Sequence, residues 1–222
     1  MRKFMDKLIK GISEFKKKDY EERKTLFAQL ATSQSPEVLF ITCSDSRIDP
    51  SMITQTQPGE LFIIRNAGNI VPPHAMPGGG NTATIEYAVA VLGVKDIIIC
   101  GHTDCGAMKG AMNPESLASL PQVSSWLGHS QAALARVKAR HGEHMCSDHT
   151  LEMIQENVLL QLKHLETHPS VAAKMATNDV TLHGWVYNIA TGEVTCHSPD
   201  QGTFIPVQDW YDDHKLVANQ RA

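Results

Sequence analysis

Residues 38–47 read VLFITCSDSR, an unbroken apolar run that ends in a short polar loop. Two later stretches have the same form, LFIIR (Leu61 to Arg65) and DIIICG (Asp96 to Gly101), and each is bounded by turn residues and followed by polar or glycine-rich sequence. Continuous apolar runs, without the alternation of a half-exposed strand, are typical of parallel strands covered on both faces. The three runs therefore predict central strands of a parallel sheet.

Helical patterns separate and follow these strands. TATIEYAVAVLG (82–93) lies between the second and third strands and ends at a glycine, a common helix stop. Further helices are expected around residues 123–139 and from about 148 to 166, the second with an apolar face made of Leu151, Ile154, Val158, Leu162 and Leu165. TLHGWVYNIATGEVTCH (181–197) predicts a hairpin around Thr191-Gly192. The alternation indicates an α/β fold with a mostly parallel central sheet flanked by helices.

Residues 1–32 predict a helical arm before the first strand. Phe4, Leu8, Ile12 and Phe15 recur at three- and four-residue steps, while Lys and Glu fill the other faces. An arm this amphipathic needs a surface for its apolar stripe, either its own sheet or a second subunit, and we expect it to pack on a partner subunit. Because no repeat or linker interrupts the chain, we expect a single domain over residues 1–222.

Composition limits the classes of partner. The 222 residues include 20 Lys plus Arg and 24 Asp plus Glu, so the net charge of −4 offers no basic field for nucleic acid or anionic lipid. No apolar stretch approaches the roughly 18 to 20 residues of a membrane span, and the charged start lacks a signal-type segment, so we expect a cytoplasmic protein. Five cysteines form a poor disulfide framework, and clustered thiols in a reducing compartment indicate metal binding or catalysis.

Two polar motifs stand where apolar strands end. Cys43-Ser44-Asp45-Ser46-Arg47 follows the first strand, and His102-Thr103-Asp104-Cys105-Gly106 follows the third. Loops at the carboxyl ends of parallel strands meet in one crevice, so the two motifs are expected to form one site. Two thiols and one imidazole suit Zn²⁺, and three protein ligands leave the open fourth position of a catalytic zinc.

Two other interpretations use the same cysteines, a structural zinc site and a thiol-redox protein. The redox interpretation lacks a Cys-x-x-Cys motif, and a structural site does not need a carboxylate such as Asp45 beside an open position. A lone His-x-x-Cys is common by chance. The position of both motifs directly after strands, and the carboxylate and guanidinium that accompany the first cysteine, favour catalysis.

The sequence resembles the β-class carbonic anhydrases over residues 34–187. The resemblance is carried, in order, by CSDSR (43–47), PGELFIIRNAGNIVPP (58–73), IEYAV (85–89), IIICGHTDCGAMKG (97–110) and HGWVY (183–187). It is closest to the plant-like branch and to the bacterial enzymes that accompany cyanase. The resemblance implies reversible hydration of carbon dioxide to bicarbonate and a proton by a zinc-bound hydroxide. A carbon disulfide or carbonyl sulfide hydrolase on the same site is the nearest alternative.

The resemblance also implies roles for individual residues. Cys43, His102 and Cys105 would bind zinc. Asp45 would accept a hydrogen bond from the zinc-bound water or hydroxide, and in some members it becomes an alternate fourth ligand that closes the site. Arg47 would hold the Asp45 carboxylate in a fork-like pair and keep it ionised.

A narrow, largely apolar pocket is expected for carbon dioxide. The resemblance implies that Phe62, Ala67 and Tyr87 line its wall, that the backbone N–H of Gly106 assists, and that Gln34 reaches the substrate from the neighbouring subunit. Phe62 and Tyr87 could equally be core aromatics. The active unit would be a homodimer or a multiple of dimers.

One position departs from the branch that is regulated by bicarbonate. That branch carries a Trp three residues before the first zinc cysteine, where this chain has Phe40, although Arg65 and Tyr187 match the rest of the regulatory pocket. Phenylalanine has no indole N–H to offer an anion. We therefore expect no cooperative inhibition by bicarbonate, and an open site in which Asp45 pairs with Arg47.

Overall fold

The computed structural model describes residues 3–76, 78–142 and 145–212. Its contacts divide the chain into two compact units, Met1–Ser35 and Pro36–Ala222, and each is described by itself.

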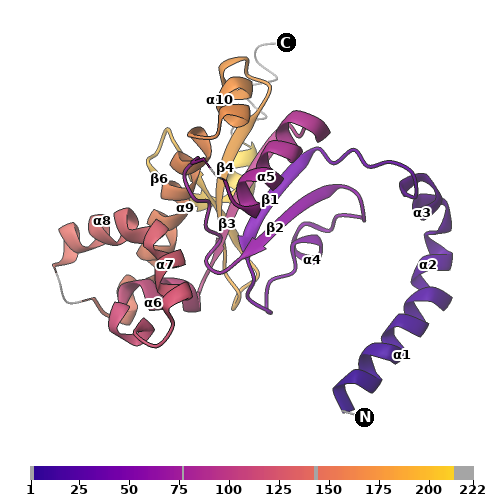
Figure 1. The fold of residues 1–222 in the computed structure, drawn as a ribbon, viewed down its shortest axis with the longest axis horizontal. Coiled ribbons are helices and arrows are strands. Elements are labelled where there is room, and N and C mark those ends of the chain that lie inside the picture. The colour runs from indigo at the N-terminus through magenta and orange to yellow at the C-terminus, as the bar shows by residue number, and fades with distance from the viewer. Residues whose placement is uncertain (1–2, 77, 143–144, 213–222) are drawn as a thin grey trace. The chain divides into compact units, whose positions relative to one another are not determined.

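The first unit consists of helices, as expected for residues 1–32. They are α1 (Lys3–Lys17), α2 (Asp19–Glu22) and α3 (Lys24–Leu30), drawn in indigo in Figure 1. The three rings of Phe15, Tyr20 and Phe27 hold the helices together, with the Tyr20 and Phe27 rings stacked at 5.2 Å between centroids. The apolar stripe of α1 stays exposed, including Phe4 and Ile12.

The second unit is built on a sheet of six strands in the order β2-β1-β3-β4-β5-β6. The pairs β1–β2, β1–β3 and β3–β4 are parallel, and β4–β5 and β5–β6 are antiparallel, so the predicted mostly parallel α/β fold is confirmed. The strands are β1 (Val38–Cys43), β2 (Leu61–Asn66), β3 (Asp96–His102), β4 (Thr181–Tyr187), β5 (Val194–Ser198) and β6 (Thr203–Pro206).

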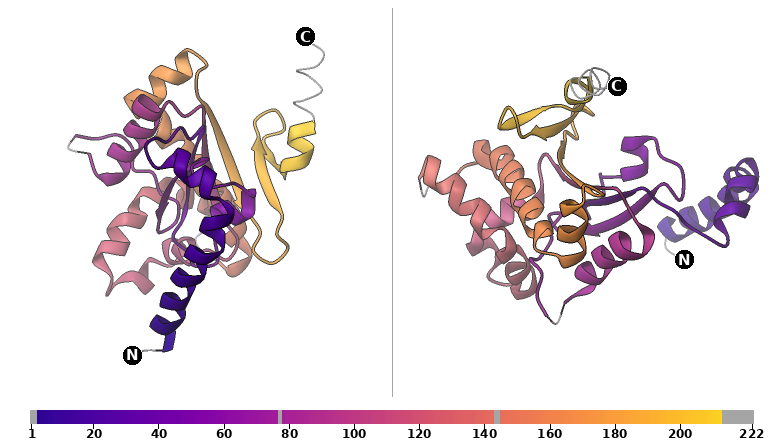
Figure 2. Two further views of the ribbon diagram at one scale, coloured as in Figure 1. Left: turned by 90° about the vertical axis from the view of Figure 1, so that its right-hand side faces the viewer. Right: turned by 90° about the horizontal axis from the view of Figure 1, so that it is seen from above.

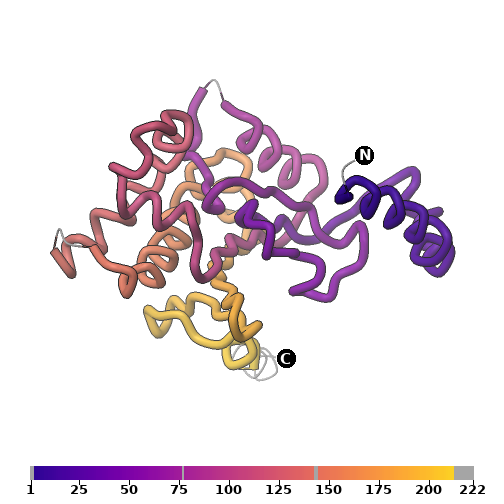
Figure 3. Tube along the Cα trace, turned by 90° about the horizontal axis from the view of Figure 1, so that it is seen from below, coloured from indigo at the N-terminus to yellow at the C-terminus, as the bar shows by residue number. Residues whose placement is uncertain are grey.

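Register brings the functional loops to one edge of the sheet. Thr42 pairs with Cys100 and Cys43 pairs with Asn66, so β1, β2 and β3 all end within about two residues of each other. The loop after β1 and the loop after β3 therefore leave the same edge side by side. Farther along the sheet, β4 leads into the predicted hairpin, which is drawn from orange to yellow in Figure 3. Gly192, in the turn of this hairpin, has a left-handed φ of 79°.

Helices connect the strands. They are α4 (Pro50–Thr54), α5 (Gly80–Glu86), a π-helix (Tyr87–Leu92), α6 (Gly106–Met112), α7 (Pro121–Leu127), α8 (Gln131–His141), α9 (Thr150–Glu166) and α10 (Pro169–Ala176), with single 3₁₀ turns at Pro114–Leu117, Gly128–Ser130 and Ser147–His149. The helix expected over 82–93 is therefore α-helical first and π-helical next, and it ends at Gly93 with φ of 70° as expected.

Two helical predictions were wrong in detail. The single helix expected around 123–139 is split into α7 and α8 by the turn at Gly128–Ser130, where the Ser130 hydroxyl donates to Asn157 Oδ1 at 2.8 Å. On α9, Leu151 is exposed, whereas Asn157 and Gln161 are buried. The buried face of α9 is thus partly polar, which apolar periodicity does not detect.

The main core lies between one face of the sheet and the helices. Leu39, Ile41, Ile97 and Ile99 of β1 and β3 belong to this core, together with residues of α5, α8, α9 and α10. In the view from above in Figure 2, magenta-to-orange helices lie along one side of the sheet. The opposite face carries a smaller buried cluster of Phe40, Ile98 and Cys100. No helix in the described ranges is both long enough and apolar enough to cross a bilayer.

Candidate metal centre

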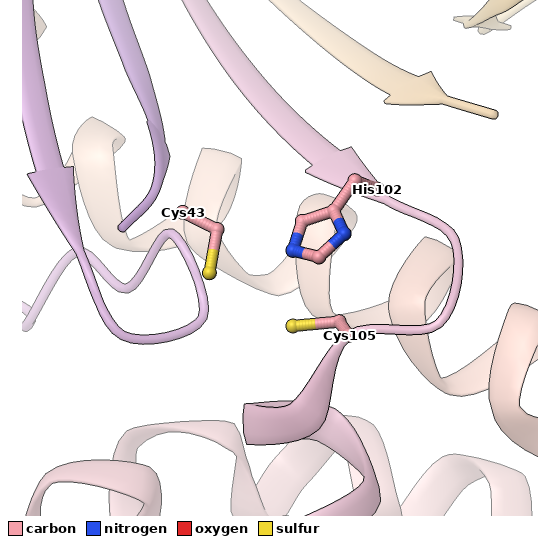
Figure 4. Close-up of side chains that lie close together, drawn as sticks. All are labelled: Cys43, His102 and Cys105. Atoms are coloured by element: carbon pink, nitrogen blue, oxygen red, sulfur yellow. The ribbon is translucent and has the colours of Figure 1, made fainter. Parts of the chain in front are cut away.

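The thiols of Cys43 and Cys105 and the imidazole of His102 converge at the edge where β1 and β3 end. Cys43 closes β1, His102 closes β3, and Cys105 immediately precedes the first turn of α6. Their ligand atoms all lie within 4.8 Å of one another, and all three residues are buried. Figure 4 shows the three side chains pointing toward a common centre. Strand ends that are far apart in sequence thus come together as the parallel register requires.

The imidazole of His102 is oriented for a ligand that the protein itself does not supply. Its Nδ1 lies 2.9 Å from the carbonyl oxygen of Thr103, so Nδ1 carries the proton and donates it. The Nε2 atom is then left with a lone pair, and it is buried without a hydrogen-bond partner. A buried unsatisfied acceptor costs free energy, and a metal ion beside the two thiols would satisfy it. The donor set of two sulfurs and one nitrogen fits Zn²⁺.

The thiols of Cys43 and Cys105 interact, and their pKa values are shifted in opposite directions. Interaction with Cys105 lowers the pKa of Cys43 to about 4, against the opposing effect of burial, while the same interaction and burial raise the pKa of Cys105. Burial lowers the pKa of His102, but its interaction with the Cys43 thiolate more than offsets this and the pKa is raised. The arrangement therefore favours ionisation of Cys43 before Cys105, and a cation of charge +2 would favour ionisation of both thiols.

The amide of Gly68 contributes to this centre from the loop after β2. Its N–H donates to Cys43 Sγ at 3.4 Å, and its carbonyl accepts from Asn157 Nδ2 of α9 at 3.1 Å. Gly68 has φ of 80°, a left-handed conformation that favours glycine, and an added Cβ would lie 2.9 Å from Met108 Cε and 3.1 Å from Ala107 Cβ. Neither Gly68 nor Asn157 was given a role from the sequence. Gly68 stands within the quoted motif of residues 58–73, and a polar residue such as Asn157 in an amphipathic helix gives no specific signal.

Asp45 and Arg47 form the expected fork-like pair. Arg47 Nε donates to Asp45 Oδ1 at 2.9 Å, Arg47 Nη2 donates to Oδ2 at 2.8 Å, and the backbone N–H of Arg47 donates to Oδ1 at 3.0 Å. These bonds hold the pKa of Asp45 well below its usual range. Asp45 Oδ2 lies 3.9 Å from His102 Nε2, so an ionised carboxylate borders the three candidate ligands.

Arg47 also reaches the second loop. Its Nη1 donates to Asp104 Oδ2 at 2.9 Å, and Asp104 pairs in turn with Lys109 of α6. The hydrogen bond from Lys109 is the largest cause that lowers the pKa of Asp104 to about 2. Sequence reasoning gave Asp104 and Lys109 no role, although Asp104 stands inside the motif HTDCG.

The expected pocket residues are only partly brought together. The rings of Phe62 on β2 and Tyr87 on the π-helix lie 6.1 Å apart, with Tyr87 exposed and Phe62 half-buried. The Ala67 carbonyl accepts from Trp126 Nε1 at 2.8 Å, directly before Gly68. Gly106 begins α6 beside Cys105. Gln34 is exposed and belongs to the unit Met1–Ser35, so it is not assigned to the site of the second unit.

Comparison with known proteins identifies the family. The profile of the carbonic anhydrase family matches residues 38–194. A carbonic anhydrase of Pseudomonas aeruginosa is 48% identical over 191 residues, which cover 86% of each chain.

Two solved structures are similar as well. The β-carbonic anhydrase CcaA is 42% identical with a TM-score of 0.89, covering 91% of this chain and 99% of that one. A tetrameric β-carbonic anhydrase of the ascomycete Sordaria macrospora is 30% identical with a TM-score of 0.76, covering 87% of this chain and 96% of that one. The chain therefore belongs to the carbonic anhydrase family and, within it, to the β-class, zinc enzymes that hydrate carbon dioxide.

Proposed function

We propose that this chain interconverts carbon dioxide and bicarbonate at a zinc site held by Cys43, His102 and Cys105. The observation that carries the proposal is the buried, unpartnered Nε2 of His102, which faces two thiols within 4.8 Å. Zinc bound there supplies a Lewis acid that brings the pKa of water to about 7. Three protein ligands would leave one coordination position of the ion open for water or substrate.

Asp45 is the residue that we assign to orienting the attacking water. Its carboxylate is ionised throughout the physiological pH range because Arg47 lowers its pKa, so it accepts hydrogen bonds and donates none. By accepting a hydrogen bond from the water or hydroxide, Asp45 would direct a lone pair of that oxygen toward carbon dioxide. Arg47 holds both carboxylate oxygens and thereby fixes the direction of that hydrogen bond.

We assign the apolar wall of the carbon dioxide pocket to Phe62, Ala67 and Tyr87, and a supporting N–H to Gly106. The pairing of the Phe62 and Tyr87 rings supports a common apolar surface, and the backbone of Ala67 adjoins the Gly68 amide that contacts Cys43. The assignment of Gln34 requires a neighbouring subunit, and rests on the family resemblance alone.

We further propose that the enzyme is a homodimer or a multiple of dimers, and that residues 1–32 pack on a partner subunit as an appendage of one domain. The exposed apolar stripe of α1 supports this, since exposed patches of that kind usually mark interfaces. The Sordaria macrospora relative is tetrameric. A cytoplasmic location is proposed because all five cysteines are free thiols.

Stopped-flow hydration of carbon dioxide, with and without a chelator, tests the function. We expect activity to disappear after exhaustive chelation and to return when zinc is added. Hydration by protein shown to be free of metal would refute the proposal. Assays with carbon disulfide and carbonyl sulfide, run on the same preparation, would reveal the alternative hydrolase as a higher turnover on either substrate than on carbon dioxide.

A further inference from the structure

Asp104 lies between two proposed zinc ligands, and the proposed mechanism uses none of its groups. Its backbone has a φ of 60°, in the left-handed region that residues other than glycine seldom adopt. In this conformation two acceptors of Asp104 face Arg47 at once. The carboxylate Oδ2 accepts from Arg47 Nη1 at 2.9 Å, and the carbonyl oxygen accepts from Arg47 Nη2 at 3.2 Å.

These contacts occupy the edge of the guanidinium that Asp45 leaves free. Asp45 accepts from Nε and Nη2 of Arg47, whereas Asp104 accepts from Nη1 and also from Nη2. A guanidinium held by one carboxylate can still swing about that pair, particularly when its side chain is 42% exposed, as that of Arg47 is. A guanidinium held at two edges has a single orientation.

Lys109 completes the arrangement from α6. Its ammonium pairs with Asp104 Oδ1, so the two carboxylate oxygens of Asp104 are divided between Lys109 and Arg47. Charges then alternate along the row Asp45, Arg47, Asp104, Lys109. The row joins the loop that follows Cys43 of β1 to the loop after β3, which carries Cys105, and to α6. Networks of this kind restrain side chains better than isolated surface ion pairs do.

We propose that Asp104, supported by Lys109, is a positioning residue that fixes the Arg47 guanidinium in the orientation that holds Asp45. The inference rests on the proposed function, because it gives Asp104 an effect on turnover only through Asp45. Asp104 lies outside the reacting groups, so the effect is one of orientation.

The test compares Asp104→Asn with a matched control. Asparagine tolerates the left-handed conformation, so the loop should fold. Its side chain has no charge and offers one acceptor oxygen where the carboxylate of Asp104 offers two. Asp179→Asn is the control, because Asp179 is equally exposed (54% against 55%) and is also ion-paired, to Lys174 at 3.1 Å, but lies outside the row from Asp45 to Lys109. Lys109→Met removes the support of Asp104 while leaving its contact with Arg47.

Two readouts are taken on the zinc-loaded enzyme. We expect kcat of Asp104→Asn to fall about three- to fivefold, which is the upper range for the loss of an exposed ion pair, while KM stays within about twofold of the wild-type value. The kcat of Lys109→Met should fall less. Phenylglyoxal, which attacks guanidinium nitrogens, should label Arg47 faster in Asp104→Asn, as followed by mass spectrometry. Arg140, which is paired with Glu152 and Glu156, serves as the internal reference.

The proposal requires both a lower kcat and a faster labelling of Arg47 in Asp104→Asn. If Asp104→Asn matches Asp179→Asn either in kcat or in the labelling rate of Arg47, the proposal is wrong. Labelling does not depend on activity. A wild-type protein that fails to hydrate carbon dioxide would therefore refute the proposed function, while the labelling rate would still decide whether Asp104 restrains Arg47.

Discussion

Replacing Asp45 with asparagine should leave zinc bound and still remove most of the hydration activity. The carboxylate makes three hydrogen bonds with Arg47, two to Oδ1 and one to Oδ2, at 2.8 to 3.0 Å. An asparagine side chain keeps one acceptor oxygen and puts an NH₂ group in place of the other. One N–H of Arg47 would then face a donor, and the negative charge next to His102 would be lost.

The size of the effect follows from the bonds that are lost. One charge-assisted hydrogen bond contributes about 1.5 to 3 kcal/mol, which corresponds to roughly tenfold to more than a hundredfold in rate if it is fully expressed in the transition state. The loss of stability should be smaller than the effect on turnover, because Arg47 is 42% exposed and solvent screens the pair.

Zinc content and turnover must be measured on the same preparation. We expect one zinc per chain in Asp45→Asn, because none of the three converging ligand atoms is altered, together with a kcat reduced at least tenfold. Asp179→Asn, which alters an ion-paired carboxylate away from the centre, should keep both at the wild-type level. Near-wild-type turnover in zinc-replete Asp45→Asn would refute the role given to this carboxylate.

Three further predictions concern assembly, regulation and pH. Deleting residues 1–30 should lower both the oligomer mass and the activity, and an active monomer in light scattering would contradict the assigned packing of the arm. Rising bicarbonate should not inhibit sigmoidally, because Phe40 is fully buried without a polar group and Arg65 already donates to the carbonyls of residues 43 and 45; a sigmoidal loss of activity would show otherwise. Burial lowers the pKa of His164 and of His168 below the unfolded value of about 6.5, so the unfolded state binds protons more readily and stability should be lost as pH falls below about 6.5. Urea unfolding at a series of pH values checks this, with a flat profile from pH 7.5 to 5 as the contrary result.

The sequence was most informative where one physical constraint acts alone. Central strands are buried on both faces, so β1 and β3 appear as continuous apolar runs and were predicted within a residue of their ends. The convergence of Cys43, His102 and Cys105 followed from the same parallel arrangement, and the structure places their ligand atoms together. Their role as zinc ligands stays a prediction until metal is measured.

Other features depend on tertiary contacts that local patterns do not reveal. The break between α7 and α8 accompanies a hydrogen bond from Ser130 to Asn157, a partner that lies on α9. The strand β6 is only four residues long and pairs at the end of the sheet, so its composition carries little signal. Asp104 acquires its contacts from a backbone conformation and from Lys109 one turn along α6, neither of which a motif indicates.

Metal analysis and hydration activity of Cys105→Ser test the central claim most directly. Removing this thiolate leaves two protein ligands, so the variant should lose zinc and activity together. Cys100→Ser is the matched control, because Cys100 is as buried as Cys105 and lies outside the centre. It should keep one zinc per chain and full turnover. A Cys105→Ser protein that retains one zinc per chain would contradict the assignment of the metal centre.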